Sequence, residues 1–330
     1  MKSAIVGCGG VAQVHARVLG LLPDVTTLVA CADIRYERAQ AMTEAFGGRA
    51  YANLQTMLDN EAIDVLHICT PHALHVEQAE LAAARGISIF SEKPAVITRA
   101  AWTRFAALAD KVPVGICFQN RYNRTTQGMK ALLDSGELGK VLGARAMTTW
   151  FRDASYYEGT GWRGTWALDG GGALMNQQIH TLDLLTYLLG TPGHADALMA
   201  NFHMQGITET DDTVAARILF GDAPVLFYVT TAYCTNSPVL LEVACQNGTV
   251  RLEGDELTCR WENGRVDRTV YEKDQTLGKN YWGSAHIPCI TDFYDCLRQC
   301  KKPPIGIEDV AATTDLTLRL YESAGFRPEM

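Results

Sequence analysis

Over the first 120 residues, short apolar runs alternate with amphipathic helical patterns, and this alternation restricts the possible fold more than any other feature. The apolar runs occupy residues 3–10, 26–33, 64–71, 87–94 and 113–120, and helical patterns separate them. Strand-sized runs that alternate with helices predict βαβ units and a parallel sheet. The sequence therefore predicts a doubly wound α/β domain, of the Rossmann type, over residues 1–120.

The pattern changes after residue 120. Apolar segments with turn signals between them follow at residues 141–151, 212–220, 223–234, 239–252 and 265–273. The turns at 246–249 (QNGT) and 262–265 (ENGR) are typical of β-hairpins. A helical pattern at 173–189 interrupts these strands, and another at 307–324 follows them. We expect a second, α+β domain over residues 121–330 with antiparallel strands, and a last helix that packs back toward the first domain.

Composition narrows the class of protein. The 330 residues are 47% apolar and 20% charged, with a net charge of −8 and no long basic run, which argues against nucleic acid as a partner. No charged leader precedes an apolar run, and no apolar run has the length of a membrane span, so we expect a cytoplasmic location. The ten cysteines are scattered, which favours reduced thiols over disulfides or a zinc site. We expect no metal.

Gly7, Gly9 and Ala12 form a G-x-G-x-x-A motif directly after the first strand. In this motif the first glycine makes a tight turn, the second lets a pyrophosphate approach the backbone, and the helix N-terminus favours the phosphate charge. Asp33 ends the second strand, where an acid accepts from ribose hydroxyls, so NAD is the expected cofactor. Arg35 leaves NADP open as an alternative. The other residues expected to contact the cofactor here are Gly10, Val11 and Ile34.

Two further stretches carry groups suited to chemistry. The sequence SEKP places Lys93 at the carboxyl end of a parallel strand, where ligands bind in such sheets. The stretch DGGGALMNQQIHTLDLL places Asn176 and His180 four residues apart, on one face of a predicted helix that begins after three glycines. A lysine cation can stabilise an alkoxide, and a histidine can transfer a proton near neutral pH.

These motifs, together with LLDSGELGKV and the tail DFYDCLRQCKKPPIGIEDV, resemble the Gfo/Idh/MocA oxidoreductases over nearly the whole chain. The resemblance implies a Rossmann domain, a C-terminal domain with an open, mostly antiparallel sheet, NAD(P), and a sugar or polyol substrate. It also implies a homodimer or homotetramer that associates through that sheet. By the same resemblance, Lys93 holds the reacting hydroxyl and His180 takes its proton.

One departure concerns Asn176, because many sugar dehydrogenases of the family carry an aspartate there. An amide cannot accept the proton, so His180 is expected to be the base and Asn176 a positioning group. The form of this region resembles the branch that acts on nucleotide-linked or otherwise substituted hexoses, often at C3. We expect the three glycines to leave room for a sugar ring beside the helix start.

Arg163, with Tyr156 or Tyr157, is expected to contact a carboxylate, a phosphate or a sugar ring, with a structural salt bridge as the alternative role of the arginine. His72 is also expected to line the pocket. The remaining expected substrate contacts are Arg121, Trp162 and His286, and the remaining expected cofactor contacts are Thr70, Pro71, His75, Glu92, Lys93 and Gln119.

Two other functions stay open at this point. In a redox-assisted glycosidase, resident NAD oxidises C3 transiently, a base such as Tyr156 or Tyr157 removes the proton at C2, and the glycosidic substituent is eliminated. A non-catalytic dinucleotide-binding regulator is the third alternative, which the presence of both Lys93 and His180 disfavours. The sequence does not identify the sugar, the direction of reaction, whether the cofactor exchanges, or the oligomeric state.

Overall fold

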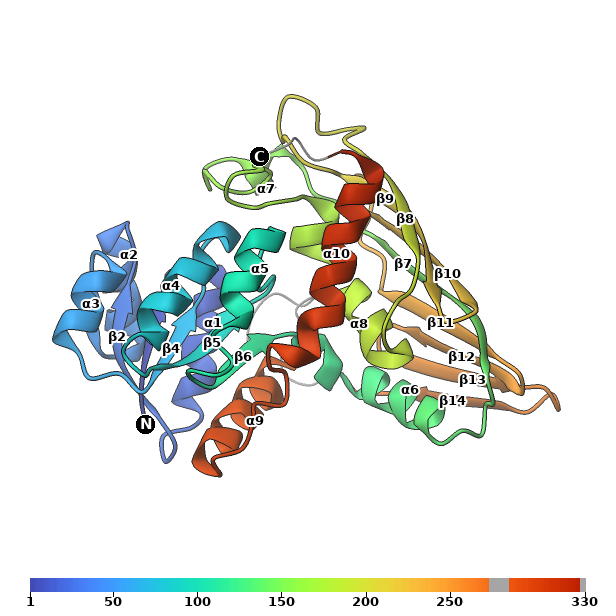
Figure 1. The fold of residues 1–330 in the computed structure, drawn as a ribbon, viewed down its shortest axis with the longest axis horizontal. Coiled ribbons are helices and arrows are strands. Elements are labelled where there is room, and N and C mark those ends of the chain that lie inside the picture. Colours follow the sequence, from blue (N-terminus) through green and yellow to red (C-terminus); the bar gives the residue numbers. More distant parts are fainter. Residues whose placement is uncertain (273–284, 327–330) are drawn as a thin grey trace. The chain divides into compact units, whose positions relative to one another are not determined.

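A computed structural model describes residues 1–272 and 285–326 of the chain. The described residues form two compact units (Figure 1). The first contains residues 1–119 and 285–311, and the second contains residues 120–272 and 312–326. This division differs from the expected one because residues 285–311 join the first unit although they follow the second in sequence. The last helix belongs to the second unit, within the residues expected for that domain, and its packing toward the first domain stays a prediction.

The first unit is built on a six-stranded parallel sheet of order β3-β2-β1-β4-β5-β6, which is the doubly wound arrangement predicted from the alternating pattern. Its strands are almost wholly buried because helices cover the sheet (Figure 1). The strands are β1 Lys2–Val6, β2 Thr27–Ala32, β3 Arg49–Tyr51, β4 Val65–Ile68, β5 Ser88–Glu92 and β6 Val114–Cys117. The helices are α1 Gly10–Gly20, α2 Tyr36–Phe46, α3 Leu54–Asn60, α4 His75–Ala83, α5 Arg99–Ala106 and α9 His286–Arg298.

Strand β3, helix α3 and the place of helix α9 were not anticipated. Strand β3 has three residues, too few to show a period, and it pairs at the sheet edge with β2. Helix α9 packs on α1 and β6. A Cβ on Gly115 would lie 2.5 Å from the ring of Phe293, so this strand glycine makes room for a buried aromatic side chain of α9. Such a long-range contact leaves no local signal in the sequence.

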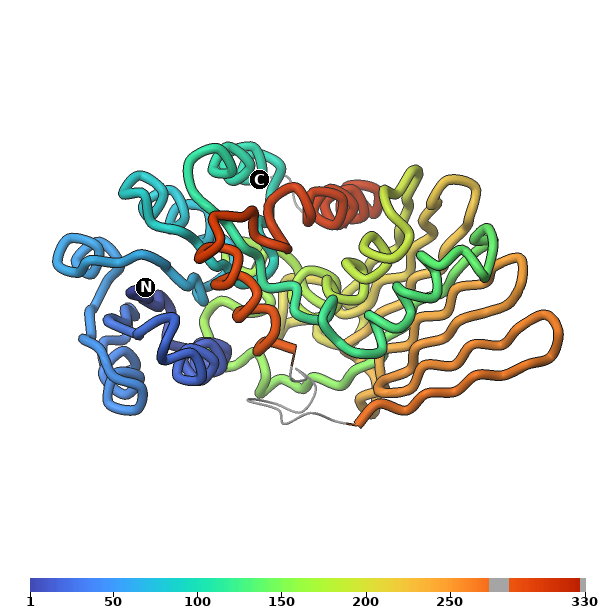
Figure 2. The backbone as a smooth tube through the Cα atoms, turned by 90° about the horizontal axis from the view of Figure 1, so that it is seen from below, coloured from blue at the N-terminus to red at the C-terminus, as the bar shows by residue number. Residues whose placement is uncertain are grey.

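The second unit is built on an eight-stranded sheet of order β14-β13-β12-β11-β7-β10-β9-β8, in which only β7 and β10 pair in parallel. Helices α6, α8 and α10 lie along one side of it (Figure 1), and β11 to β14 form a meander (Figure 2). The strands are β7 Val141–Thr149, β8 Ala195–Ala200, β9 Thr213–Phe220, β10 Ala223–Thr230, β11 Leu240–Cys245, β12 Gly248–Glu253, β13 Glu256–Trp261 and β14 Val266–Val270. The helices are α6 Arg124–Asp134, α7 Ala154–Tyr157, α8 Ile179–Leu189 and α10 Ala311–Ala324.

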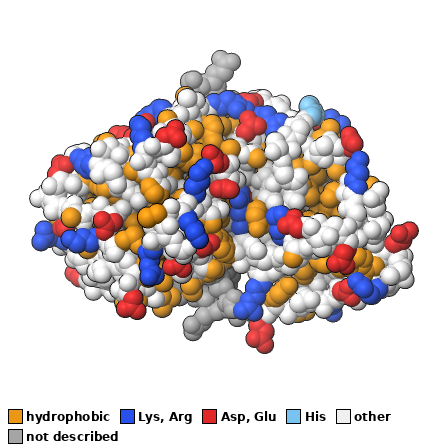
Figure 3. Space-filling model, turned by 60° about the horizontal axis from the view of Figure 1, so that its bottom comes forward, with side chains coloured by type: hydrophobic (Ala, Val, Ile, Leu, Met, Phe, Trp, Pro, Cys, Tyr) orange, Lys and Arg blue, Asp and Glu red, His pale blue; other side chains and the backbone are white. Residues whose placement is uncertain are grey.

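The described surface carries both signs of charge interspersed on the face drawn in Figure 3, without a large region of one sign. All ten cysteines are free thiols, as expected from their scattered positions, although Cys234 and Cys300 are exposed rather than buried. Within residues 1–272 and 285–326, no helix combines the length and the apolar character needed to cross a membrane.

Candidate functional site

The glycine turn between β1 and α1 has the geometry that a dinucleotide needs. Gly7 has a φ of +83°, and a Cβ there would lie 2.6 Å from the carbonyl oxygen of Cys69 on the neighbouring strand end, so only glycine fits. A Cβ on Gly9 would have no neighbour within 4 Å, so the backbone of Gly9 faces open space. No side chain caps α1, which leaves its first amides available to a phosphate. Ala12 is fully buried, as the close packing of α1 requires.

Asp33 connects this turn to the end of β2. One carboxylate oxygen accepts from the backbone N–H of Cys8 and the other from that of Arg35, both at 2.8 Å. The carboxylate is partly exposed and keeps lone pairs for further donors, so the residues present fit a bound ribose. Ile34 is 91% exposed and Arg35 is exposed beside it, as expected of residues that border a cofactor site.

At the end of β5, Glu92 is buried and Lys93 is half-buried. The loop after Lys93 is held by His75, which contacts the carbonyl oxygens of Pro94 at 2.9 Å and Thr70 at 3.0 Å. Burial lowers the pKa of His75 to about 4, so the ring is neutral and donates to one of these two oxygens. His75, expected as a cofactor contact, is thus fully buried and shapes the loop that carries Lys93.

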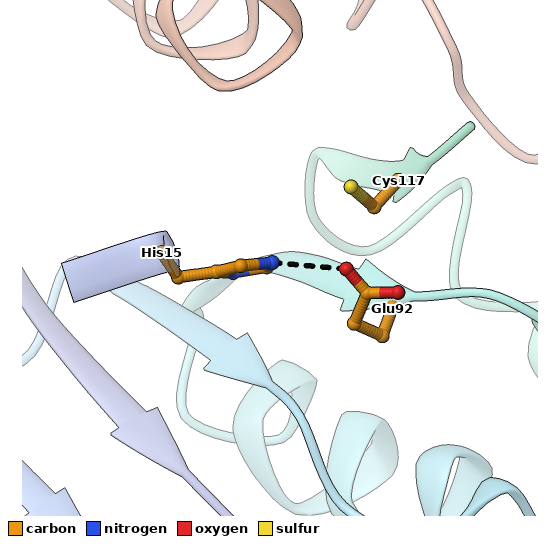
Figure 4. A group of neighbouring side chains, drawn as sticks. All are labelled: His15, Glu92 and Cys117. Atoms are coloured by element: carbon orange, nitrogen blue, oxygen red, sulfur yellow. Dashed lines mark hydrogen bonds and ion pairs between the residues drawn. The ribbon is translucent and has the colours of Figure 1, made fainter. Parts of the chain in front are cut away.

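Glu92 forms a buried ion pair with His15 of α1. The distance from His15 Nε2 to Glu92 Oε1 is 3.0 Å, and Figure 4 shows the imidazole edge pointing at the carboxylate with the Cys117 sulfur nearby. Burial raises the pKa of Glu92, but the hydrogen bond and charge of His15 outweigh it and hold that pKa well below its usual range. Burial lowers the pKa of His15, but Cys69, Cys117 and Glu92 together hold it well above its usual value.

The hydrogen bonds beyond His15 are compatible with the same charge state. The Thr26 hydroxyl donates its one proton to the carbonyl oxygen of Met1 at 3.2 Å. Ser3 can then donate to Thr26 at 2.5 Å, and Tyr294 can donate to Ser3 at 2.5 Å. His67 Nε2 then donates to the Tyr294 hydroxyl at 2.8 Å, and its Nδ1 accepts from His15 Nδ1 at 3.0 Å. In this arrangement both ring nitrogens of His15 carry protons and Glu92 faces an imidazolium, in agreement with the raised pKa of His15. This buried row of polar side chains begins at Glu92, the residue before Lys93, and continues through His15 and His67.

Ligand atoms of His15, Glu92 and Cys117 all lie within 4.8 Å of one another, which is compatible with a metal ion. In the structure a hydrogen bond joins the first two, and burial raises the pKa of Cys117, so that its sulfur is a thiol. The expectation of no metal stays a prediction for this group.

Two other predicted residues of the first unit, His286 and Gln119, are buried. His286 begins α9 with its ring 6.3 Å from that of His15, and burial lowers the pKa of His286 to about 4. Gln119 is buried, with its side-chain oxygen 3.7 Å from Cys117 Sγ. The Thr70 hydroxyl donates to Gln78 at 2.7 Å. Gln119 and His286 are therefore packed in the core, whereas Thr70 and Pro71 are partly exposed.

In the second unit, the predicted helix over residues 173–189 is continuous, but its first six residues, Ala173–Gln178, are π-helical and α8 begins at Ile179. Wide turns of this kind are frequent at functional sites. His180 is half-buried at the second position of α8. The Asn176 side chain donates to Asp169 at 2.8 Å, and Asp169 also accepts from the backbone N–H of Gly164 at 2.8 Å. Asp169 thereby fixes the direction of the Asn176 amide.

The expectation that the glycines leave room for a sugar was wrong for Gly171 and Gly172. A Cβ on Gly171 would lie 2.2 Å from the Tyr321 hydroxyl, and one on Gly172 would lie 1.9 Å from the carbonyl oxygen of Asp211. The Asp211 carboxylate accepts from the backbone N–H groups of Gly172 and Leu174 at 2.8 and 2.9 Å and from Tyr321 at 2.7 Å. The glycines are needed because the protein itself packs against them.

The remaining predicted substrate contacts lie in two places of the second unit. Arg121 is buried and forms two hydrogen bonds to Asp183, at 2.8 and 2.6 Å. The guanidinium of Arg163 lies over the ring of Tyr156 in α7 and over that of Trp162, so these side chains form a small aromatic and cationic group. Gln177 donates to the Tyr156 hydroxyl and, at 3.0 Å, to Asn176 Oδ1, which links this group to the helix of His180.

Five residues important to this geometry escaped the sequence reasoning: His15, Arg152, Asp169, Gln177 and Asp211. Asp169 and Gln177 flank the glycine and asparagine motif, so their position offered a signal. His15 lies inside the amphipathic pattern of α1, and Asp211 lies in a loop far along the chain. Nothing local distinguishes these two, since only the fold brings them to their partners.

Comparisons with known proteins agree with this architecture. Residues 1–118 match the family described as an oxidoreductase family with an NAD-binding Rossmann fold, and residues 126–251 match the Gfo/Idh/MocA C-terminal domain. The chain is 32% identical over 198 residues to D-glucoside 3-dehydrogenase of Escherichia coli, a match that covers 58% of this chain and 55% of that protein. It is 26% identical over 226 residues to glucose-6-phosphate 3-dehydrogenase of Bacillus subtilis, covering 64% of this chain and 61% of that protein.

Among solved structures, the WlbA dehydrogenase of Bordetella pertussis, in complex with NADH and UDP-GlcNAcA, superposes with a TM-score of 0.86 at 28% identity, covering 98% of this chain and 96% of the other. The chain matches only 55% and 61% of the lengths of the two dehydrogenases named above. The structural likeness to the WlbA dehydrogenase, in contrast, includes both units. A parallel Rossmann sheet with an NAD-binding glycine turn, followed by an open and mostly antiparallel sheet, is thus shared along the chain. This protein belongs to the Gfo/Idh/MocA family of oxidoreductases and binds NAD through its first unit.

Proposed function

We propose that this protein is an NAD-dependent dehydrogenase that oxidises a secondary alcohol of a sugar or sugar derivative. The proposed reaction uses no metal ion. The observation that carries the proposal is Lys93, held at the carboxyl end of β5 by a buried Glu92 and a loop anchored on His75, in the unit that binds NAD. Ligands of parallel sheets bind at these strand ends. His180, half-buried on α8, supplies the proton acceptor.

In the proposed reaction, the Lys93 ammonium donates a hydrogen bond to the reacting oxygen and stabilises the negative charge that develops there. His180 takes the hydroxyl proton as the carbon–oxygen double bond forms. NAD, held at the glycine turn and Asp33 of the first unit, would supply the acceptor for the hydride that leaves the same carbon. Asn176 cannot take a proton, and its amide is oriented by Asp169, so it acts by positioning.

The carbon we propose is C3 of a hexose derivative. This rests on the names of two relatives, D-glucoside 3-dehydrogenase and glucose-6-phosphate 3-dehydrogenase, and on the resemblance of the Asn176 region to the branch acting on substituted hexoses. The relatives, at identities of 32% and 26%, support a hydroxyl group of a sugar or sugar derivative as the group that is oxidised.

The test is the nicotinamide absorbance of purified protein mixed with hexoses, hexuronates, glycosides, hexose phosphates and nucleotide sugars, with and without added NAD. We expect steady NADH formation that requires added NAD. Formation of one equivalent or less without added NAD, with release of the aglycone, would instead identify a redox-assisted glycosidase. Lack of any absorbance change with the whole panel would contradict both.

The redox-assisted glycosidase would need Tyr156 or Tyr157 as the base that removes the proton at C2. Burial, with the nearby Tyr156 and acidic groups, raises the pKa of Tyr157 to about 12, which disfavours the phenolate that would remove a proton at C2. The Tyr156 hydroxyl accepts from Gln177. We therefore favour the dehydrogenase.

Two substitutions test the assigned roles. Lys93→Ala and His180→Ala should each lower kcat by at least about 100-fold, the usual contribution of a positioned acid or base. The affinity for NADH, measured by nicotinamide fluorescence, should stay close to that of the parent protein. Full turnover by either variant would remove that residue from the mechanism.

We also propose a homo-oligomer that associates through the side of the eight-stranded sheet opposite α6, α8 and α10. On that side Leu240, Met147, Tyr228, Ala215 and Leu198 stand in register across five adjacent strands. Met147 is 43% exposed and Leu198 is 68% exposed, which is unusual for apolar side chains in a row. Met147→Lys with Tyr228→Lys should shift the mass measured by light scattering to that of the monomer. An unchanged mass would exclude this face.

A further inference from the structure

Arg163 has an unusual environment for a cation. Its guanidinium carbon lies 4.3 Å from the centre of the Tyr156 ring and 5.5 Å from that of Trp162. Its Nη1 donates to the carbonyl oxygen of Tyr156 at 3.2 Å. The residue is half-buried in the turn that follows α7. The aromatic faces and one backbone oxygen thus hold the guanidinium in a fixed orientation.

The sequence left two roles open for Arg163, a salt bridge or a contact to the substrate. Among the described residues, no carboxylate lies within ion-pair distance of it, and its buried Nε has no hydrogen-bond acceptor. Arg265 shows the contrast, because it stacks on Trp261 at 4.4 Å and also pairs with Asp267 at 3.0 Å. A guanidinium has five N–H donors, and a half-buried one without an anion leaves most of its hydrogen-bonding capacity unused.

A second guanidinium approaches the same ring. Arg152 is buried, with its guanidinium carbon 5.3 Å from the centre of the Tyr156 ring and 4.9 Å from that of Trp150. Its Nη2 donates to Gln177 Oε1 at 3.0 Å, and Gln177 donates to the Tyr156 hydroxyl. Tyr156 therefore lies between two cations and is tied to the helical segment that carries Asn176.

The acids near this group are already engaged. Asp153 accepts from Ser155 Oγ at 2.6 Å and from the backbone N–H of Tyr156 at 3.2 Å, and it caps α7. Asp169 accepts from Gly164 and Asn176. Neither of these two acids pairs with Arg163, so the positive charge of Arg163 is left for an external group.

We infer that Arg163, with the Tyr156 ring and Arg152 behind it, forms a subsite for an anionic substituent of the substrate, a carboxylate or a phosphate. The planar fork of a guanidinium matches both groups and binds them through paired hydrogen bonds. Since the adjoining helix carries Asn176 and His180, the substituent belongs to the sugar that the proposed dehydrogenase oxidises. The inference rests on that proposed function and narrows its substrate to acidic sugars or sugar phosphates.

The experiment compares kcat/KM for glucose, glucuronate and glucose 6-phosphate in the parent protein, Arg163→Gln, Arg163→Lys and the matched control Arg265→Gln. We expect the parent to prefer one anionic sugar, and Arg163→Gln to reduce the ratio of anionic to neutral kcat/KM by about 10- to 100-fold, the loss of one charged hydrogen-bonding partner. The loss should be mainly in KM. Arg163→Lys should restore part of the ratio, and Arg265→Gln should leave it unchanged.

A loss of kcat/KM for glucuronate in Arg163→Gln would indicate a carboxylate subsite, and a loss for glucose 6-phosphate would indicate a phosphate subsite. A ratio unchanged in Arg163→Gln would overturn the inference and leave the dehydrogenase proposal intact. If the parent oxidises none of the three sugars, calorimetric titration of the NAD-loaded protein with glucuronate, glucose 6-phosphate and inorganic phosphate decides the question. Absence of binding, or equal binding by the parent and Arg163→Gln, would then overturn the subsite.

Discussion

Acidification should destabilise the first unit through its buried neutral histidines. Burial lowers the pKa values of His75 and His286 to about 4 in the folded protein, against an ordinary value of 6.5. A histidine with a lowered folded pKa contributes its full stability above the unfolded pKa. That contribution is lost as the pH falls below 6.5, because the unfolded chain binds the proton first.

The magnitude follows from these two pKa values. At pH 5 the unfolded imidazole is almost fully protonated and the folded one is mostly neutral, which costs about 2 kcal/mol for each histidine relative to pH 7 and about 4 kcal/mol for the two. His15 works in the opposite direction, because its pKa is raised and its contribution is lost only as the pH rises through the folded value. Glu92 keeps its contribution at pH 5, because its lowered pKa places the loss below its ordinary value of 4.5.

The assay is urea unfolding at pH 7 and pH 5, followed by far-ultraviolet circular dichroism, for the parent protein, His286→Gln and the exposed-site control His203→Gln. Glutamine does not titrate, so His286→Gln should lose about 2 kcal/mol less between the two pH values than the parent does. His203→Gln, at an exposed position, controls for the loss of an imidazole as such. Equal losses in the parent and His286→Gln would refute the argument, since His286 would then titrate alike in both states.

Three further outcomes are expected. Replacing His15 or Glu92 alone by glutamine should lower the unfolding free energy by about 3–5 kcal/mol, because a buried charge loses its partner. The double variant should lose clearly less than the sum of the two single losses. Additive losses would exclude the buried ion pair. Gly172→Ala should destabilise by about 1–3 kcal/mol through its clash with the Asp211 backbone, whereas Gly20→Ala, with no neighbour within 4 Å, should stabilise slightly; equal thermal melting of the two variants would contradict the packing argument. EDTA should leave the melting temperature unchanged, and a decrease would identify the His15, Glu92 and Cys117 group as a metal site.

Local sequence patterns were sufficient for the parts of this protein whose chemistry is local. The alternation of apolar runs and helices predicted the parallel sheet, and the spacing of Gly7, Gly9 and Asp33 predicted the NAD-binding turn, because backbone geometry and phosphate contact impose residue types at fixed distances along one βαβ unit. Hairpin signals likewise predicted the antiparallel strands of the second unit.

The short elements could not be predicted in this way. Strand β3 has three residues, and the first turns of the helix over residues 173–189 are π-helical although their sequence pattern is that of an ordinary α-helix. The π-helical start is accompanied by contacts from Asp211 and Tyr321, which come from distant parts of the chain. Propensity carries no information about such contacts.

The sequence by itself determined the fold class and the cofactor motif, and it pointed to Lys93 and His180 as the residues of the proposed chemistry. Only the tertiary structure decided what surrounds them. It placed His15 against Glu92, packed the protein against Gly171 and Gly172, and left Arg163 on aromatic rings rather than on a carboxylate. The physical reason is that burial and pairing depend on neighbours many residues away, whereas turns, caps and periodicity depend on neighbours within a few residues.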